Sequence, residues 1–251
     1  MALGTKLGII ASSGAGSSFE NIYSLDFDGT DDYLTGSSTF SDLNGATNAS
    51  FSMWLKPISG GSTLRMVFQI GRGSTALNSQ CQLFLYEGNR IDFSVNAGGQ
   101  YGRGDISSIT YGSWNHLVIA VDLTHGGTPE CQIFVNGADE TTGDNMSSVG
   151  SFMTATDELY IGESKTGHYN PFNGNIDEFA IWPGTTLTLA QAQAIYNSGA
   201  PTDLASFSPA PSHWWRNGDG DTYPNITDNI GSYNLGMINM ASGDIETDVP
   251  T

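Results

Sequence analysis

Short segments in which apolar and polar residues alternate run through most of this chain. Within residues 49–56, for example, Phe51, Met53 and Leu55 alternate with Ser52, Trp54 and Lys56. A period of two residues indicates β-strands with one face in a core. The predicted strands are Tyr23–Phe27, Ala49–Lys56, Arg65–Ile70, Gln82–Tyr86, Arg90–Val95, Asn115–Asp122, Gln132–Asn136, Glu158–Ile161 and Gly174–Trp182. The chain is therefore predicted to be all-β, and 251 residues suffice for one large sandwich or two small domains.

One segment, residues 188–198, is predicted to form a helix. It is rich in alanine and begins with Thr188, a good N-cap residue. Gly199 stands where a left-handed residue ends a helix, and Pro201 follows it. We expect this short helix to cap an open end of the sandwich.

The charge of the chain limits its partners. It holds 26 acidic and 8 basic residues, for a formal charge of −18. Such a surface repels nucleic acid and anionic membranes, so neither a nucleic-acid partner nor membrane insertion is expected. No apolar run approaches the length of a bilayer span. An external, ion-rich medium fits this charge, and solubility alone is the alternative explanation.

The two cysteines do not form a disulfide framework. Cys81 and Cys131 each lie in a Cys-Gln-x-Phe context within a predicted strand. A single disulfide requires those two strands to be neighbours, and two buried thiols are the preferred interpretation.

Several motifs follow one another in a characteristic order along the chain. They are Phe27-Asp-Gly-Thr-Asp-Asp-Tyr33, Phe51-Ser-Met-Trp-Leu-Lys56, Trp114-Asn-His-Leu-Val118, Ile133-Phe-Val-Asn-Gly137 and Phe172-Asn-Gly-Asn-Ile-Asp-Glu-Phe-Ala-Ile-Trp182. In order and spacing they resemble laminin-G-like jelly rolls of the concanavalin A-like lectin/glucanase superfamily. The resemblance covers residues 23–200 and implies a jelly-roll β-sandwich of two antiparallel sheets.

Three parts of the chain are predicted. Residues 1–20 form a flexible or partner-ordered N-terminal arm, residues 21–205 the jelly roll, and residues 206–251 a C-terminal segment. In many relatives a piece similar to Trp214-Trp-Arg216 precedes the first strand, whereas here it comes late. The C-terminal segment therefore either completes the sandwich, as in a circular permutation, or docks on a neighbouring subunit.

The resemblance also implies a structural calcium ion between the first and last strands. The ligands carried over to this sequence are Asp28, Gly29, Asn175 and Asp177, which offer carboxylate and carbonyl oxygens. The alternative is that these acids form Asx-turns and accept backbone N–H groups. A second acidic run, residues 217–228, is predicted to be a Gly/Asp turn, because it lacks the glycine of a calcium loop.

No catalytic arrangement is apparent, and the chain is predicted not to be an enzyme. Asp177 and Glu178 are adjacent, so on a regular strand their side chains point to opposite faces. A retaining glycosidase instead needs two carboxylates close together. The histidines lack the spacing of a metal site.

A glycan site is predicted in a glycine-rich loop, residues 96–105, and in a second loop. Tyr101, Arg103, Asp105, His168 and Tyr169 supply aromatic rings and hydrogen-bonding groups there. The alternative is that aromatic residues in β-loops seal the ends of the sandwich.

The first residues of the chain and the run Trp215-Arg-Asn-Gly-Asp-Gly-Asp-Thr222 are similar to laminin-G-like virion structural proteins of marine bacteriophages. This resemblance implies a non-enzymatic structural or adhesion protein on the surface of a virus particle, as capsid decoration or fibre. Its partners would be copies of itself, other virion proteins and host glycans. The alternative is a free carbohydrate-binding module or a secreted lectin-like domain.

Overall fold

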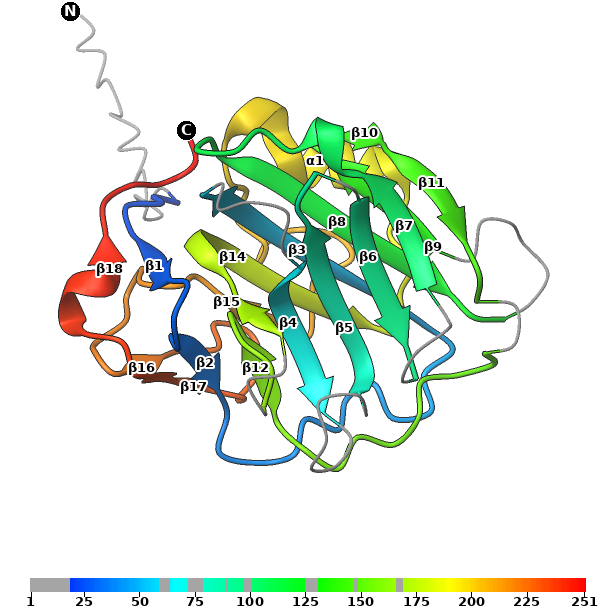
Figure 1. The fold of residues 1–251 in the computed structure, drawn as a ribbon, viewed down its shortest axis with the longest axis horizontal. Helices are drawn as coiled ribbons and strands as arrows, with labels where there is room; N and C mark the ends of the chain where they lie inside the picture. The colour runs from blue at the N-terminus through cyan, green and yellow to red at the C-terminus, as the bar shows by residue number, and fades with distance from the viewer. Residues whose placement is uncertain are drawn as a thin grey trace, which may run out of the picture.

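The computed structural model describes residues 19–58, 64–71, 79–88, 90–96, 101–124, 131–146, 149–165 and 169–251. It shows the predicted all-β jelly roll, in which an eight-stranded and a ten-stranded sheet pack face to face (Figure 1). Strand pairing is antiparallel except for the two-residue strand β13 (Asn170–Pro171), which runs parallel to β4 (Leu64–Gly71).

The eight-stranded sheet is centred on the long strands β3 and β14. Its order is β10-β9-β8-β3-β14-β1-β18, and β15 also pairs with β14. The bounds are β10 (Ala138–Asp139), β9 (Cys131–Val135), β8 (Asn115–Asp122), β3 (Asn48–Pro57), β14 (Asn173–Pro183), β1 (Ser24–Asp28), β18 (Ile245–Glu246) and β15 (His213–Trp215). Thus β1 and β15 lie on the same side of β14, one after the other.

The ten-stranded sheet has the order β11-β7-β6-β5-β4-β12-β2-β17-β16, with β13 beside β4. Its remaining strands are β11 (Thr141–Asp144), β7 (Tyr101–Asp105), β6 (Arg90–Val95), β5 (Ser79–Tyr86), β12 (Leu159–Ile161), β2 (Tyr33–Thr35), β17 (Leu235–Ile238) and β16 (Asn225–Ile226). Every strand expected from alternation is present within three residues of its predicted ends.

Strand β7 corrects one expectation, because its residues were predicted to lie in a loop. Gly102 and Gly104 suggested a flexible loop, yet both face the opposite sheet. A Cβ atom on Gly102 would lie 2.1 Å from Cys131 Sγ, and one on Gly104 would lie 2.8 Å from Ile133 Cγ2. The glycines therefore permit close packing of the two sheets rather than a flexible loop.

The core between the sheets is built from aromatic and aliphatic side chains. Phe51 lies 5.0 Å from Phe68 and 5.4 Å from Phe93 between ring centroids, and all three are buried. Cys81 and Cys131 are buried free thiols, as predicted. Burial raises the pKa of both thiols, which keeps them protonated.

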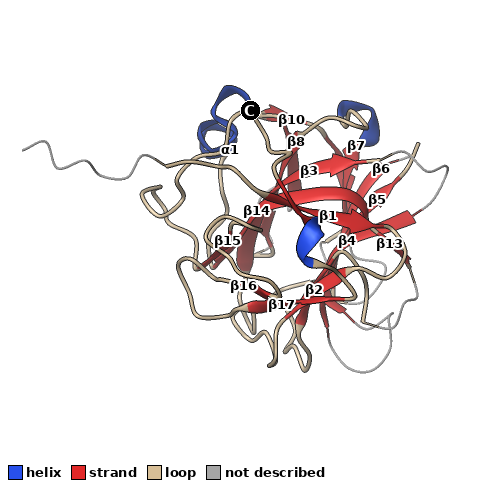
Figure 2. Cartoon of the chain, turned by 90° about the vertical axis from the view of Figure 1, so that its left-hand side faces the viewer, coloured by secondary structure: helices blue, strands red, loops and turns tan. Residues whose placement is uncertain are grey.

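Helix α1 (Leu189–Tyr196) lies on the outer face of the eight-stranded sheet (Figure 2). Ala192 and Ile195 pack there against a second apolar cluster that includes Trp182 and Trp214. The helix thus covers a sheet face instead of closing an open end. Thr188 is its N-cap, as predicted, but the left-handed residue at its end is Asn197, at φ 46°, two residues before Gly199.

Residues 206–251 add strands to both sheets of the same molecule. β15 and β18 join the eight-stranded sheet, while β16 and β17 extend the ten-stranded sheet beyond β2. Figure 1 shows this red segment beside the blue strands β1 and β2. Among the described residues, no helix is long and apolar enough to cross a membrane.

Candidate functional site

The outer face of the ten-stranded sheet is polar around β5, β6 and β7. In β6, the core side chains are Ile91, Phe93 and Val95. Because side chains alternate along a strand, Arg90, Asp92 and Ser94 lie on the outer face. The register places Tyr101 of β7 opposite Ser94, and Arg103 opposite Asp92, on that same face.

Charged side chains on this face form one cross-strand network. Asp92 accepts a hydrogen bond from Arg90 Nε at 2.8 Å and another from Arg103 Nε at 3.1 Å. The Arg103 guanidinium lies 3.6 Å from the ring centroid of Tyr101, and that of Arg90 lies 5.2 Å from the ring of Tyr86. Stacking and pairing together hold both guanidinium groups in fixed orientations.

Ser94 lies at the centre of this face with an unused hydroxyl group. The residue is 9% exposed, and its Oγ has no hydrogen-bond partner among the described residues. Its cross-strand neighbours are Tyr101 on one side and Gln82 on the other. A buried hydroxyl without a partner costs free energy, and because this atom exposes almost no surface, a polar group of a ligand can bind it only when a neighbouring side chain shifts.

Tyr169 lies on the β5 side of the same face. Its ring meets the edge of Phe84 at a centroid distance of 4.6 Å, and burial raises the pKa of its hydroxyl. The structure therefore brings Tyr169 to the same face as Tyr101 and Arg103, with Ser94 and Gln82 between them. His168, predicted to belong to this site, lies outside the described residues.

Asp105 also lies on β7, but its carboxylate does not join the network of Asp92, Arg90 and Arg103. Its carboxylate accepts the backbone N–H of Ser107 at 2.8 Å, and that hydrogen bond lowers its pKa. Although Asp105 stands opposite Arg90 in the register, no ion pair joins the two side chains. Two residues of this face, Asp92 and Ser94, were not predicted as site residues from the sequence. They lie two residues apart on a predicted strand, and this spacing could have indicated that they share one face.

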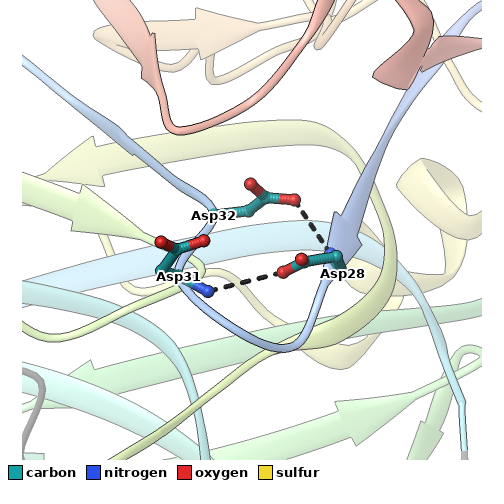
Figure 3. Close-up of side chains that lie close together, drawn as sticks. All are labelled: Asp28, Asp31 and Asp32. Atoms are coloured by element: carbon teal, nitrogen blue, oxygen red, sulfur yellow. Dashed lines mark hydrogen bonds between the residues drawn. The ribbon is translucent and has the colours of Figure 1, made fainter.

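A cluster of three acids lies in the turn after β1 (Figure 3). Asp28 Oδ1 accepts the N–H groups of Thr30, at 2.7 Å, and of Asp31. Asp32 Oδ2 accepts the N–H of Asp28 at 3.0 Å. These are the Asx-type contacts given above as the alternative to calcium, although one oxygen of each of the three carboxylates also lies within 4.8 Å of the others.

The four residues predicted to share a calcium ion are divided between two places. Asp28 pairs with Asn173 of β14, whereas Asn175 pairs with Asp26. Asp177 lies four residues beyond Asn173, about 13 Å along an extended strand. Asp28 and Asp177 therefore cannot bind one ion in this fold.

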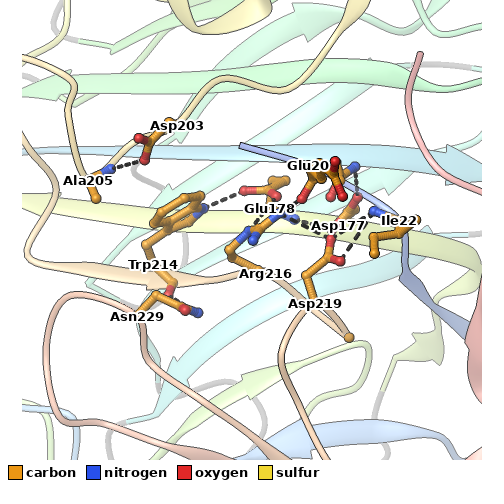
Figure 4. Close-up of polar contacts among 12 residues, drawn as sticks. Glu20, Ile22, Asp177, Glu178, Asp203, Ala205, Trp214, Arg216, Asp219 and Asn229 are labelled. Carbon is orange, nitrogen blue, oxygen red and sulfur yellow. Dashed lines mark hydrogen bonds and ion pairs between the residues drawn. The ribbon is translucent and has the colours of Figure 1, made fainter. Parts of the chain in front are cut away.

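Asp177 belongs instead to a buried polar cluster at a bulge in β14 (Figure 4). Between Asp177 and Ala180 the register shifts by one residue, and Glu178 has a positive φ of 52°. The extra residue brings the carboxylates of Asp177 and Glu178 into one cluster. The expectation that they point to opposite faces was wrong, because it assumed a regular strand.

The acidic side chains of this cluster outnumber its cations. Arg216 contacts Glu178 at 3.2 Å and Asp219 at 3.2 Å, and the Trp214 indole donates to Glu178 at 2.5 Å. Asn21 Nδ2 donates to Asp177 at 2.8 Å. Burial raises the pKa of all three acids, and that of Glu178 rises to about 7. A pocket of about 490 Å³ opens beside this cluster, between Phe19, Trp214 and Asp203.

Two amide oxygens in the same cluster have no partner among the described residues. Asn217 is fully buried, and its Nδ2 donates to the carbonyl of Ile176 at 3.3 Å, while its Oδ1 is unpaired. The Oδ1 atom of Asn21 is also unpaired. Amide and carboxylate oxygens are the ligands that calcium prefers, so the two unpaired amide oxygens make this cluster a second candidate place for the ion, beside the turn after β1.

Comparisons with known proteins agree with this architecture. A family model described as "Concanavalin A-like lectin/glucanases superfamily" (Laminin_G_3) matches residues 28–193. Because the match covers more than half of the chain, the protein belongs to this family. No curated protein sequence matches it.

Two kinds of solved structure share the fold. A native heptameric SAP-like pentraxin from Limulus polyphemus is 17% identical, with a TM-score of 0.56 over 88% of this chain and 98% of that chain. The CBM40 domain of the Ruminococcus gnavus IT-sialidase, solved with α2,3-sialyllactose, is 10% identical, with a TM-score of 0.51 over 69% of this chain and 95% of that chain. At these identities the likeness shows the fold alone.

Proposed function

We propose that this protein binds carbohydrate on the outer face of its ten-stranded sheet, without catalysing a reaction. The observation that carries the proposal is the buried, unpartnered Oγ of Ser94, between Tyr101 and Gln82. Sugar recognition combines aromatic surface with a few oriented polar groups, and both are present here. A lectin-like superfamily and a neighbour solved with a bound oligosaccharide support this reading. Turnover of any polysaccharide by the pure protein would contradict it.

Substitution Tyr101→Ala should weaken glycan binding. The ring offers a stacking surface and supports Arg103, so the expected loss is on the order of 0.5–1.5 kcal/mol, up to about tenfold in Kd. Binding to a glycan array, followed by calorimetric titration of the strongest ligand, measures it. Tyr223→Ala is the matched control, because Tyr223 is an exposed tyrosine outside this face. If both variants bind the glycan with the same affinity, Tyr101 is not part of the binding site.

A structural calcium ion is the second part of the proposal. The ion would be held by Asp177, Asn21, Asn217 and Asp219. It would neutralise buried negative charge and link the residues just before β1 to β14 and to the C-terminal segment. The unpaired oxygens of Asn21 and Asn217 support this residue set.

Calcium should therefore raise the melting temperature, and more at pH 8 than at pH 5. Without the ion, the pKa of Glu178 rises from 4.5 to about 7 on folding. The folded state then binds more protons, so this group lowers stability as pH rises from about 4.5 through 7. Thermal unfolding with calcium and with a chelator tests this. The rise in melting temperature caused by calcium should vanish in Asp177→Asn and persist in Asp31→Asn. If it instead vanished in Asp31→Asn and persisted in Asp177→Asn, the ion would lie in the turn after β1.

Assembly is a second candidate function, favoured by the heptameric state of the pentraxin that shares the fold. Self-association would suit a protein that displays the sugar-binding face repeatedly. Light scattering of the purified protein tests it, and a monomer at all concentrations would contradict it. The role as capsid decoration or fibre of a phage particle, and the alternative of a secreted protein, stay predictions that particle proteomics can check.

A further inference from the structure

Two arginines on this acidic protein share a single carboxylate as their ion-pair partner. Of the eight basic residues, Lys6 and Arg72 lie outside the described part of the chain. Four others each have at least one acid of their own: Lys56 pairs with Asp248, Arg65 with Glu87, Lys165 with Asp157, and Arg216 with Glu178. Arg90 and Arg103, by contrast, share the single carboxylate of Asp92.

We infer that the glycans bound on this face carry an anionic group, either a carboxylate or a sulfate ester, held by Arg103 and Arg90. This inference rests on the proposed glycan site and names its ligand class. Both arginines use Nε–H to bind Asp92, and the described residues accept no hydrogen bond from their terminal nitrogens. These N–H groups are planar, paired donors of the kind that bind carboxylate or sulfate oxygens in a bidentate manner.

The guanidinium groups are also held in place before any ligand arrives. The Arg103 guanidinium lies over the ring of Tyr101, and its Nε–H donates to Asp92. Little side-chain entropy is then lost on binding. The side chains of Arg90 and Arg103 remain 30% and 33% exposed, so an oligosaccharide on the sheet can reach them.

The neighbouring acid Asp105 leaves the terminal donors of the arginines free. Asp105 stands opposite Arg90 and stays ionised, so it offsets part of the positive charge, but its carboxylate accepts the N–H of Ser107 and forms no ion pair with Arg90. Ser94, adjacent to Asp92 on the same face, offers its unpaired Oγ to a sugar hydroxyl. An anionic sugar would thus bind with its charge at the arginines and a hydroxyl at Ser94.

The test is a glycan array with neutral, carboxylated and sulfated versions of the same backbones, probed at low and at physiological salt. We expect the anionic versions to bind on the order of tenfold tighter or more than the neutral ones, with the preference reduced by salt. Arg103→Gln should abolish the preference. Arg103→Lys should keep only part of it, because lysine lacks the planar pair of donors.

Lys56→Gln is the matched control, since it removes the same charge from the other sheet. It should leave the preference unchanged, and thermal unfolding verifies that all variants are folded. The carboxylated and sulfated arms show which anion is bound. Equal binding of neutral and anionic versions would overturn this inference and leave the proposed function standing, whereas no binding to any glycan would overturn both.

Discussion

A variant that ends at Ala205 should fail to fold. The deletion removes Trp215, Ile226, Leu235, Met237 and Met240 from the core between the sheets. Burial of each such side chain contributes about 1.5–3 kcal/mol, so their sum reaches the roughly 5–15 kcal/mol of a whole domain. Strands β14 and β2 would also lose hydrogen-bonded partners. Circular dichroism and chemical denaturation should show no cooperative transition.

A shorter deletion serves as the control. A variant that ends at Thr247 keeps β18 and loses the ion pair between Lys56 and Asp248, whose side chains are 24% and 42% exposed. It also loses the hydrogen bonds that Ser24 Oγ and Trp114 Nε1 donate to Asp248. An exposed ion pair contributes about 0–1 kcal/mol and a hydrogen bond about 1 kcal/mol, so this variant should still fold cooperatively. If the variant ending at Ala205 unfolds cooperatively as a stable monomer, the C-terminal strands are an appendage and not part of the sandwich.

Arg216→Met should produce the largest loss among single substitutions. Arg216 pairs with Glu178 and Asp219, both buried, and also donates to the carbonyl of Glu20 at 2.5 Å. Removing one partner of a buried ion pair leaves an uncompensated charge and costs about 3–5 kcal/mol. Urea denaturation at pH 8 measures the loss. At pH 5 it should be smaller, because Glu178, with its pKa of about 7, is then protonated.

Arg90→Met is the matched control for this prediction. Arg90 also pairs with an acid, but its side chain is 30% exposed, so its loss should cost less than about 1 kcal/mol. Adding Glu178→Gln to Arg216→Met should restore part of the stability. Similar losses in Arg90→Met and Arg216→Met would mean that the cluster at the bulge holds no buried charge.

The fold followed from the sequence because several of its long strands, such as β3 and β6, alternate between core and outer side chains. In β3, the pattern of Phe51, Met53 and Leu55 faces the core as expected. Most strands of two to four residues, such as β2 and β17, are too short to give a period and were missed, although β12 was predicted. Strand β7 was missed because a glycine in the sequence can mark either a loop or a place where two sheets pack closely, and the local sequence does not distinguish the two.

The candidate site was predicted in part. Tyr101, Arg103 and Tyr169 were recognised by residue type and do share one face, but Asp92 and Ser94 gain their meaning only from the register of β6 with its neighbours. The bulge in β14 is a tertiary feature, since no local pattern marks Glu178 for a positive φ. The contacts of Asp177 with Asn21 and of Asp219 with Ile22 span 156 and 197 residues of sequence.

A crystal structure with the strongest array ligand tests the central claim most directly. The account predicts an oligosaccharide on the ten-stranded sheet, with a sugar hydroxyl on Ser94 Oγ and a ring beside Tyr101. An oligosaccharide seated instead in the pocket between Phe19 and Trp214, with Ser94 Oγ still unpaired, would contradict it.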